Sequence, residues 1–158
     1  MKKSNLLLTS DNLFYGNNKI LSILSDETNI FYFFRNKYDE NGNIIINIFD
    51  EIEKIQEHGF SFINCILCPL KTDGTFSDNV LYVLWFTNNI KKYSVNKDAI
   101  REKSIWKDVE WGKREKNYNS KGKDPGNVWI PTEDDGKGKI TNHVRLDFIQ
   151  IIERLIRF

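Results

Sequence analysis

Residues 44–67 read IIINIFDEIEKIQEHGFSFINCIL, and the character of the sequence changes twice within this stretch. Five of the first six residues are apolar and four are isoleucine, as in a strand buried inside a mostly parallel sheet. Asp50 and Glu53 have the spacing of a helix-capping box, and Gly59 can end that helix in a left-handed conformation. A second apolar run over residues 60–67 predicts another strand. Strand, helix and strand in this order predict an α/β fold.

The segments on either side supply further elements. Residues 5–9 predict a short buried strand, and residues 79–86 predict a third strand of the sheet. Residues 19–35 are apolar at mixed spacing, which favours a helix, and residues 39–43 carry a turn signal. Residues 143–158 predict an amphipathic helix, with a polar stripe formed by Asp147, Gln150, Arg154 and Arg157.

Positive charge is concentrated in one region of the chain, although the formal net charge is only +1. Residues 1–90 carry 7 Lys/Arg against 11 Asp/Glu, whereas residues 91–145 carry 14 against 9. A basic block suits a polyanion, but a solvated lysine-rich loop explains it equally well. We therefore divide the chain into an α/β core (1–90), a loop-rich basic region (91–141) and a terminal helix (142–158) that packs on the core in a single folded unit.

Other chemistry has weak support in the sequence. Cys65 and Cys68 form a C-x-x-C pair, but the two histidines, His58 and His143, lack zinc-finger spacing to it, so buried strand cysteines are favoured. Neither histidine has a recognisable catalytic partner. The acidic residues 133–135 could hold a divalent cation, although an exposed turn is the favoured interpretation.

The sequence also bears on membranes and location. No run of 18 apolar residues occurs, so no membrane-spanning helix is predicted. Residues 1–8 open like a signal peptide, but the apolar stretch is too short and no small-residue cleavage site follows. We predict a cytoplasmic protein.

Five segments, in order along the chain, resemble the β-class of bacterial DNA amino-methyltransferases, which methylate the exocyclic amino group of cytosine or adenine. The best match is GKDPGNVWIP at residues 122–131, which is similar to the family's G-K-N-P-G-D-V-W-x-I-P. The others are the glycine-phenylalanine strand element at 58–67, the strand ending in L-W-F-T at 76–87, the D-x-[IV]-R stretch at 93–101, and the element that opens the cofactor half at 143–156.

This resemblance implies a partial Rossmann-like methyltransferase sheet flanked by helices, with a basic target-recognition insertion. It also implies double-stranded DNA as the partner, because Lys and Arg hold phosphates while Asn and Arg reach base edges. The residues expected to contact DNA are Arg101, Lys113, Arg114, Lys116, Asn117, Lys121, Lys123 and Asn127. Trp129, together with Pro125 and Pro131, is expected to pack the loop onto the sheet.

The chain departs from the family where the chemistry would occur. The catalytic loop of relatives reads [DNS]-P-P-[YFW], and its counterpart here is Ser10, Asp11, Asn12 and Leu13, without either proline; residues 35–38 match less well. The prolines would fix the loop that receives a flipped-out base. The S-adenosylmethionine loop, F-x-G-x-G, has no counterpart, since the G-x-G at residues 136–138 reads as a turn. We therefore expect no intact catalytic residue and no cofactor, unless a partner completes the site.

Three functions follow as hypotheses. The first is a DNA-binding, non-catalytic methyltransferase-like protein of a restriction-modification or phage system. The second is one subunit of a split S-adenosylmethionine-dependent DNA methyltransferase. The third is an interaction protein that retains only the fold. Because the family's cofactor half would cover one side of the sheet, exposed apolar surface is expected here, and with it a homo-oligomer or a complementary subunit.

Overall fold

A computed structural model of the chain describes residues 4–10, 22–70, 79–104, 119–135, 137 and 139–158. The chain divides into two compact units. Unit 1 comprises Met1–Leu67 and Thr72–Ser94, and unit 2 comprises Cys68–Lys71 and Val95–Phe158.

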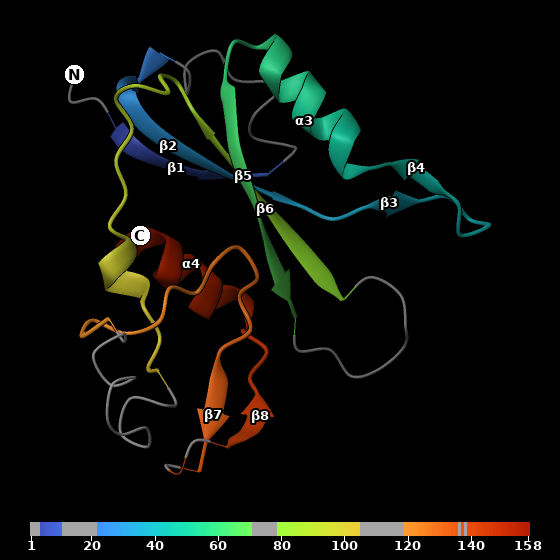
Figure 1. Cartoon of the computed structure of the whole chain (residues 1–158). Helices are drawn as coiled ribbons and strands as arrows, with labels where there is room; N and C mark the ends of the chain where they lie inside the picture. The colour runs from blue at the N-terminus through green and yellow to red at the C-terminus, as the bar shows by residue number, and fades with distance from the viewer. Residues whose placement is uncertain (1–3, 11–21, 71–78, 105–118, 136, 138) are drawn as a thin grey trace. The chain divides into compact units, whose positions relative to one another are not determined.

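The main sheet has four strands in the order β1-β2-β6-β5, as Figure 1 shows. These strands are β1 (Ser4–Thr9), β2 (Leu24–Phe34), β5 (Ser61–Pro69) and β6 (Val80–Thr87). β1 runs parallel to β2, and β2 runs antiparallel to β6, so the sheet is mixed. The predicted strands at 5–9, 60–67 and 79–86 are confirmed, but the expectation of a mostly parallel sheet is not.

β2 occupies the part of the chain for which the sequence favours a helix, and that prediction is wrong for residues 24–34. Its neighbours lie on both edges, with Phe31 opposite Leu8 of β1 and Trp85 of β6. Consecutive residues from Thr28 to Tyr32 are buried, because side chains on both faces of this strand are covered. A strand buried on both faces lacks the alternation of apolar and polar residues that distinguishes a half-buried strand from a buried helix.

The helix of unit 1, α3 (Ile48–Glu57), starts earlier than the sequence suggests. Its cap is Asn47, whose side-chain oxygen accepts hydrogen bonds from the backbone of Phe49 (2.8 Å) and Asp50 (3.3 Å). The Asp50 carboxylate accepts the Asn47 N–H at 3.1 Å, so Asp50 is the third helical residue of a capping box and not the cap. The helix ends as predicted, with Gly59 at φ +88.

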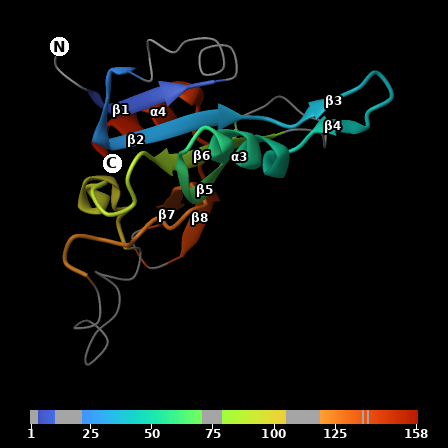
Figure 2. The same ribbon diagram turned by 90° about the horizontal axis from the view of Figure 1, so that it is seen from above.

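The isoleucine run before α3 forms only a short strand, β4 (Ile44–Ile46), which pairs with β3 (Lys37–Tyr38) in a hairpin of its own. Ile44 and Ile45 are exposed, and Figures 1 and 2 show the hairpin extending from the end of β2 away from the sheet. The prediction that this run lies inside the main sheet is therefore wrong. Residues 44–67 do not form a strand–helix–strand unit of one sheet.

One apolar cluster joins the sheet of unit 1 to α3. Its buried members are Leu24, Ile30, Tyr32, Phe34, Ile55, Phe60, Leu84 and Phe86. The Tyr32 hydroxyl donates a hydrogen bond of 2.9 Å to Oε2 of Glu51, and both residues are buried. The helix is thus held by apolar packing and by a polar contact to the central strand.

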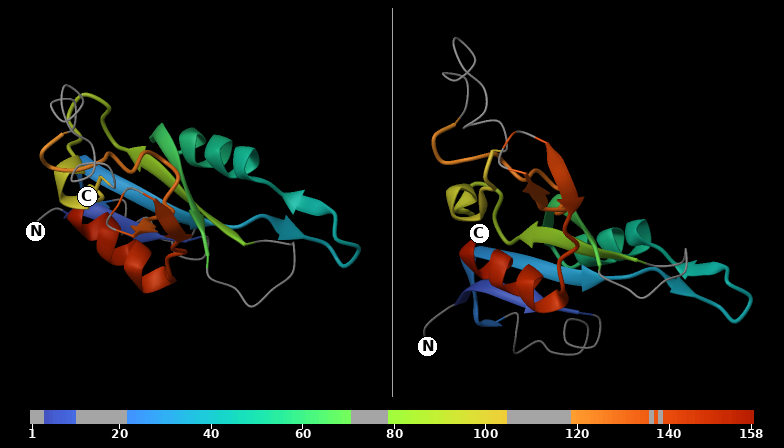
Figure 3. Two further views of the ribbon diagram at one scale, coloured as in Figure 1. Left: turned by 60° about the horizontal axis from the view of Figure 1, so that its bottom comes forward. Right: turned by 90° about the horizontal axis from the view of Figure 1, so that it is seen from below.

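The described part of unit 2 contains four short elements: the 3-10 helix η1 (Lys97–Ile100), β7 (Thr132–Asp134), β8 (Ile140–His143) and the helix α4 (Phe148–Arg157). β7 and β8 pair antiparallel in a hairpin, and the right view of Figure 3 shows both strands in orange and red. Asp147 caps α4 in a reciprocal pair with Gln150. Arg154 is buried while Ile149 and Ile156 are exposed, so the predicted polar stripe does not describe the outer face of α4.

Candidate nucleic-acid interface

A single antiparallel bridge between Glu102 and Lys123 brings two distant parts of unit 2 together. The Glu102 N–H donates to the Lys123 carbonyl at 3.0 Å, and the Lys123 N–H donates to the Glu102 carbonyl at 2.7 Å. Gly122 lies beside this bridge with φ +103, and a Cβ atom there would lie 2.4 Å from the Glu102 carbonyl oxygen. The bridge therefore requires glycine at this position.

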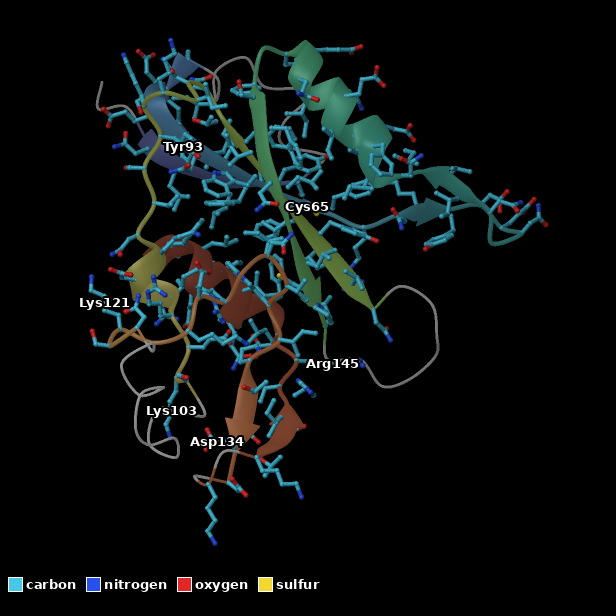
Figure 4. The ribbon with its side chains drawn as sticks, in the orientation of Figure 1. Cys65, Tyr93, Lys103, Lys121, Asp134 and Arg145 are labelled. Carbon is cyan, nitrogen blue, oxygen red and sulfur yellow. The ribbon has the colours of Figure 1, made fainter. Side chains whose placement is uncertain are left out.

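Charged side chains surround the bridge. Asp98 in η1 binds two cations: Oδ1 accepts a hydrogen bond from Arg101 Nε at 2.7 Å, and Oδ2 contacts Lys121 Nζ. Lys97 lies 3.1 Å from Oδ2 of Asp124 in a second pair. Figure 4 labels Lys121, the most exposed cation of these pairs. We call the four cations near the bridge the basic cluster: Lys97, Arg101, Lys121 and Lys123.

The carboxylates of Asp98 and Asp124 are held in the ionised form. The hydrogen bonds from Lys121 and then from Arg101 lower the pKa of Asp98 below its ordinary value. The pKa of Asp124 is lowered first by the backbone N–H of Gly126 and then by Lys97. The pairs are exposed to solvent, so they order the side chains but add little to the stability of the fold.

A buried arginine supports the bridge from α4. Arg154 Nη2 donates to the Ile100 carbonyl at 2.9 Å and to Glu102 Oε1 at 2.8 Å. Its guanidinium also lies 4.8 Å from the centre of the Trp129 ring, a cation–π distance. Trp129 is buried and its indole N–H donates to the Gly126 carbonyl at 3.2 Å. Trp129 is thus buried within unit 2, as a packing role requires, and its predicted contact with the sheet stays a prediction.

The structure places half of the predicted DNA-contacting residues. Arg101 follows η1, and Lys121, Lys123 and Asn127 lie in the segment 119–129 of unit 2. Lys123 and Asn127 are exposed, at the bridge and just after it. The other four predicted residues, Lys113, Arg114, Lys116 and Asn117, lie outside the described residues.

Sequence reasoning missed several residues of this region, namely Lys97, Asp98, Glu102, Asp124 and Arg154. The spacing of Asp98 and Arg101 in a helical turn is the one local signal for an ion pair. The contact between Arg154 and Glu102 has no such signal, because the two residues are 52 positions apart.

The other predicted sites are the counterpart of the catalytic loop and the cysteine pair, and neither presents a reactive group among the described residues. Ser10 is exposed directly after β1, and Asp11, Asn12 and Leu13 lie outside the described residues. Cys65 and Cys68 lie in β5, and burial raises the pKa of the Cys65 thiol to about 11. At neutral pH this thiol is protonated, which makes it a poor nucleophile.

Within the described part of the chain, no group of three or more His, Cys, Asp or Glu side chains could hold a metal ion. The Asp135 carboxylate accepts backbone hydrogen bonds from Lys137 (2.8 Å) and Lys139 (3.0 Å), so it stabilises the turn between β7 and β8. Asp134 lies 4.0 Å from Lys103, and Figure 4 labels both. Across the described ranges, neither α3 nor α4 has the length and apolar run needed to cross a bilayer.

Comparisons with known proteins give distant structural similarities. No protein-family model matches the chain, and no curated protein matches it. Among solved structures, the chain is similar to a protein from Thermus thermophilus provisionally described as a DNA modification methylase. The two share 13% sequence identity with a TM-score of 0.48, over 99% of this chain and 68% of that one. At this level the similarity assigns neither a family nor an activity to the chain.

Proposed function

We propose that the chain binds double-stranded DNA through the basic cluster of unit 2 and does not methylate it on its own. The observation that carries this proposal is the gathering of Lys97, Arg101, Lys121 and Lys123 around the bridge at Glu102. Phosphate contacts from Lys and Arg supply most of the affinity of sequence-independent DNA binding.

The bridge also determines where the basic segment leaves and rejoins the rest of unit 2. Residues 103–123 carry seven Lys/Arg against three Asp/Glu, and the paired Glu102 and Lys123 lie at the two ends of this segment. Both ends are therefore close to Arg101 and Lys121. A cationic surface of this kind can follow a phosphate backbone, and the exposed Asn127 is the side chain that we propose for contact with a base edge.

The proposed absence of methylation rests on the altered loop at residues 10–13, which lacks the prolines of the family it resembles. Equilibrium titration with S-adenosylmethionine, with and without duplex DNA, tests it. We expect no cofactor binding in either case. Binding at micromolar concentration would restore autonomous methylation as the leading function.

The DNA-binding proposal is tested by measuring the affinity for random duplex DNA across a salt series. We expect a linear fall of log K with log salt concentration for the wild-type chain. The double variant Lys121→Ala/Lys123→Ala should reduce the magnitude of that slope by about 1.8, since each phosphate contact contributes about 0.9. A charge-matched control, Lys54→Ala/Lys91→Ala, removes two exposed lysines of unit 1 and should leave the slope unchanged.

Two outcomes reject the proposal. A wild-type chain that binds no duplex DNA at about 50 mM salt, or that binds it with no salt dependence, does not use a basic surface. An equal reduction of the salt-dependence slope in both double variants would show that the chain binds DNA through its overall charge and not through the basic cluster.

A second function is favoured by exposed apolar side chains on α4. Phe148, Ile149 and Ile156 are all exposed on this helix, which is typical of a surface that binds another protein. We propose as the alternative that the chain is one subunit of an assembly, such as a split methyltransferase. Light scattering of the wild type and of Ile149→Ser tests self-association: a wild-type monomer at high concentration excludes the homo-oligomer.

A further inference from the structure

We infer that Arg101 and Lys121 form a seat for one phosphate group, and that the carboxylate of Asp98 occupies this seat when no DNA is bound. The inference rests on the proposed DNA binding and names the side chains that compete for the DNA backbone. Its basis is a carboxylate that bridges two cations from separate segments of unit 2.

The geometry of this contact is that of a bound oxyanion. Each carboxylate oxygen of Asp98 has its own cation, Arg101 Nε for Oδ1 and Lys121 Nζ for Oδ2. Two oxygens of a phosphate group can accept hydrogen bonds from the same two cations. Charge-assisted hydrogen bonds to phosphates have lengths and directions similar to those of hydrogen bonds to carboxylates. The pair of cations therefore suits either anion.

Arg101 is held in place independently of Asp98. Its Nη1 donates a hydrogen bond of 3.1 Å to the Gly122 carbonyl, which belongs to the segment fixed by the bridge. If the Asp98 side chain rotates away, this contact still orients the guanidinium. Arginine thus remains preorganised for an incoming phosphate, at a lower entropic cost than a free side chain.

The seat is open to solvent. The exposed fraction of the side chain is 16% for Arg101, 41% for Asp98 and 64% for Lys121. A phosphate can reach both cations from the solvent side, and the carboxylate can leave toward it. Exposed ion pairs are weak because water screens them, so a polyanion can displace the carboxylate.

The neighbouring carboxylate has a different role. Asp124 accepts the backbone N–H of Gly126 at 2.9 Å as well as the ammonium of Lys97 at 3.1 Å, so it maintains a turn. For Asp98, the side-chain contacts to described residues are those with Arg101 and Lys121 alone. Asp98 is therefore the carboxylate that can leave without unfolding a turn.

The test is the DNA affinity of Asp98→Asn compared with that of Asp26→Asn. Both variants remove one exposed negative charge, and Asp26 also pairs with a lysine, Lys92, at 2.9 Å in unit 1. We expect Asp98→Asn to tighten binding about two- to fivefold, the equivalent of one exposed pair, and Asp26→Asn to change it less. A loss of fold stability cannot produce this gain. Equal effects in the two variants, or weaker binding by Asp98→Asn, overturn the inference.

A second measurement separates failure of this inference from failure of the proposed function. Inorganic phosphate is titrated into Asp98→Asn while the Arg101 Nε–H and Lys121 ammonium signals are followed by NMR. Saturable shifts of both signals support the seat even if the wild type binds no DNA. Absence of such shifts overturns the seat, whether or not the wild type binds DNA elsewhere.

Discussion

Arg154 and Glu102 form a buried ion pair in unit 2, with Nη2 of the arginine 2.8 Å from Oε1 of the glutamate. Only 8% and 15% of their side-chain surfaces are exposed. The pair links α4 to the bridge that joins the two ends of the basic segment. Its integrity should therefore decide whether the proposed DNA-binding surface is preorganised.

Arg154→Met should destabilise unit 2 by about 3 kcal/mol, because removing one partner of a buried pair leaves the other charge without compensation. The substitution also removes the contact to the Trp129 ring. Urea unfolding gives the free energy, and amide hydrogen exchange assigns the loss to unit 2. The double variant Arg154→Met/Glu102→Gln should recover part of the stability. Arg157→Met, at an exposed position of α4, is the control and should change stability by less than about 0.5 kcal/mol.

Gly122→Ala should destabilise the bridge by more than the roughly 1–2 kcal/mol that a positive φ costs other residues. The reason is the additional overlap between the new Cβ and the Glu102 carbonyl oxygen, 2.4 Å away. Gly42→Ala is a matched control: Gly42 has φ +82, but a Cβ there would meet nothing within 4 Å. Equal losses of unfolding free energy in the two variants would contradict the close approach at the bridge.

Asp98 should titrate below its ordinary pKa of 3.8, because Lys121 and Arg101 stabilise its ionised form. A depressed pKa in the folded state means that the stabilising contribution is fully present above the ordinary value. That contribution is lost as the pH falls through the lower, folded value. Carbon-13 NMR of the carboxyl group measures the pKa directly. In Lys121→Met the pKa should rise toward 3.8, and a wild-type value at or above 3.8 would exclude the ion pairs in solution.

Tyr32→Phe should reduce the stability of unit 1 by about 2 kcal/mol, since it removes a buried hydrogen bond to a carboxylate. Tyr38→Phe, at an exposed position of the β3–β4 hairpin, should have almost no effect on the unfolding free energy. Chemical denaturation of both variants provides the comparison. A similarly small loss of unfolding free energy in both variants would show that the hydrogen bond from Tyr32 to Glu51 does not stabilise unit 1.

The sequence predicts elements well where one local rule dominates. Apolar runs predict β1, β5 and β6, Gly59 predicts the end of α3, and Asn and Gly residues predict the turn before β4. The error at β2 has a physical cause. The strand lies between two others and is buried on both faces, so its apolar residues show no period of two.

The site was harder to predict than the elements. Charge patterning located the basic region, and the family resemblance named four of its described residues, Arg101, Lys121, Lys123 and Asn127, all of which belong to unit 2. It did not reveal that Asp98 also pairs with Lys121, because that contact depends on the bridge between Glu102 and Lys123, which are 21 residues apart in sequence. Long-range pairs of this kind have no periodic signal in a single sequence.

The position of β2 has a consequence for synthesis on the ribosome. β1 emerges before β2 and can pair with one of its edges at once, since Leu8 and Phe31 are close in sequence. The second edge must wait for β6, whose Trp85 pairs with Phe31 only after a further stretch of chain has emerged. During that interval an apolar strand has an unpaired edge, the kind of surface that invites aggregation. Translation speed between residues 35 and 87 should therefore affect the yield of soluble chain more than translation speed elsewhere.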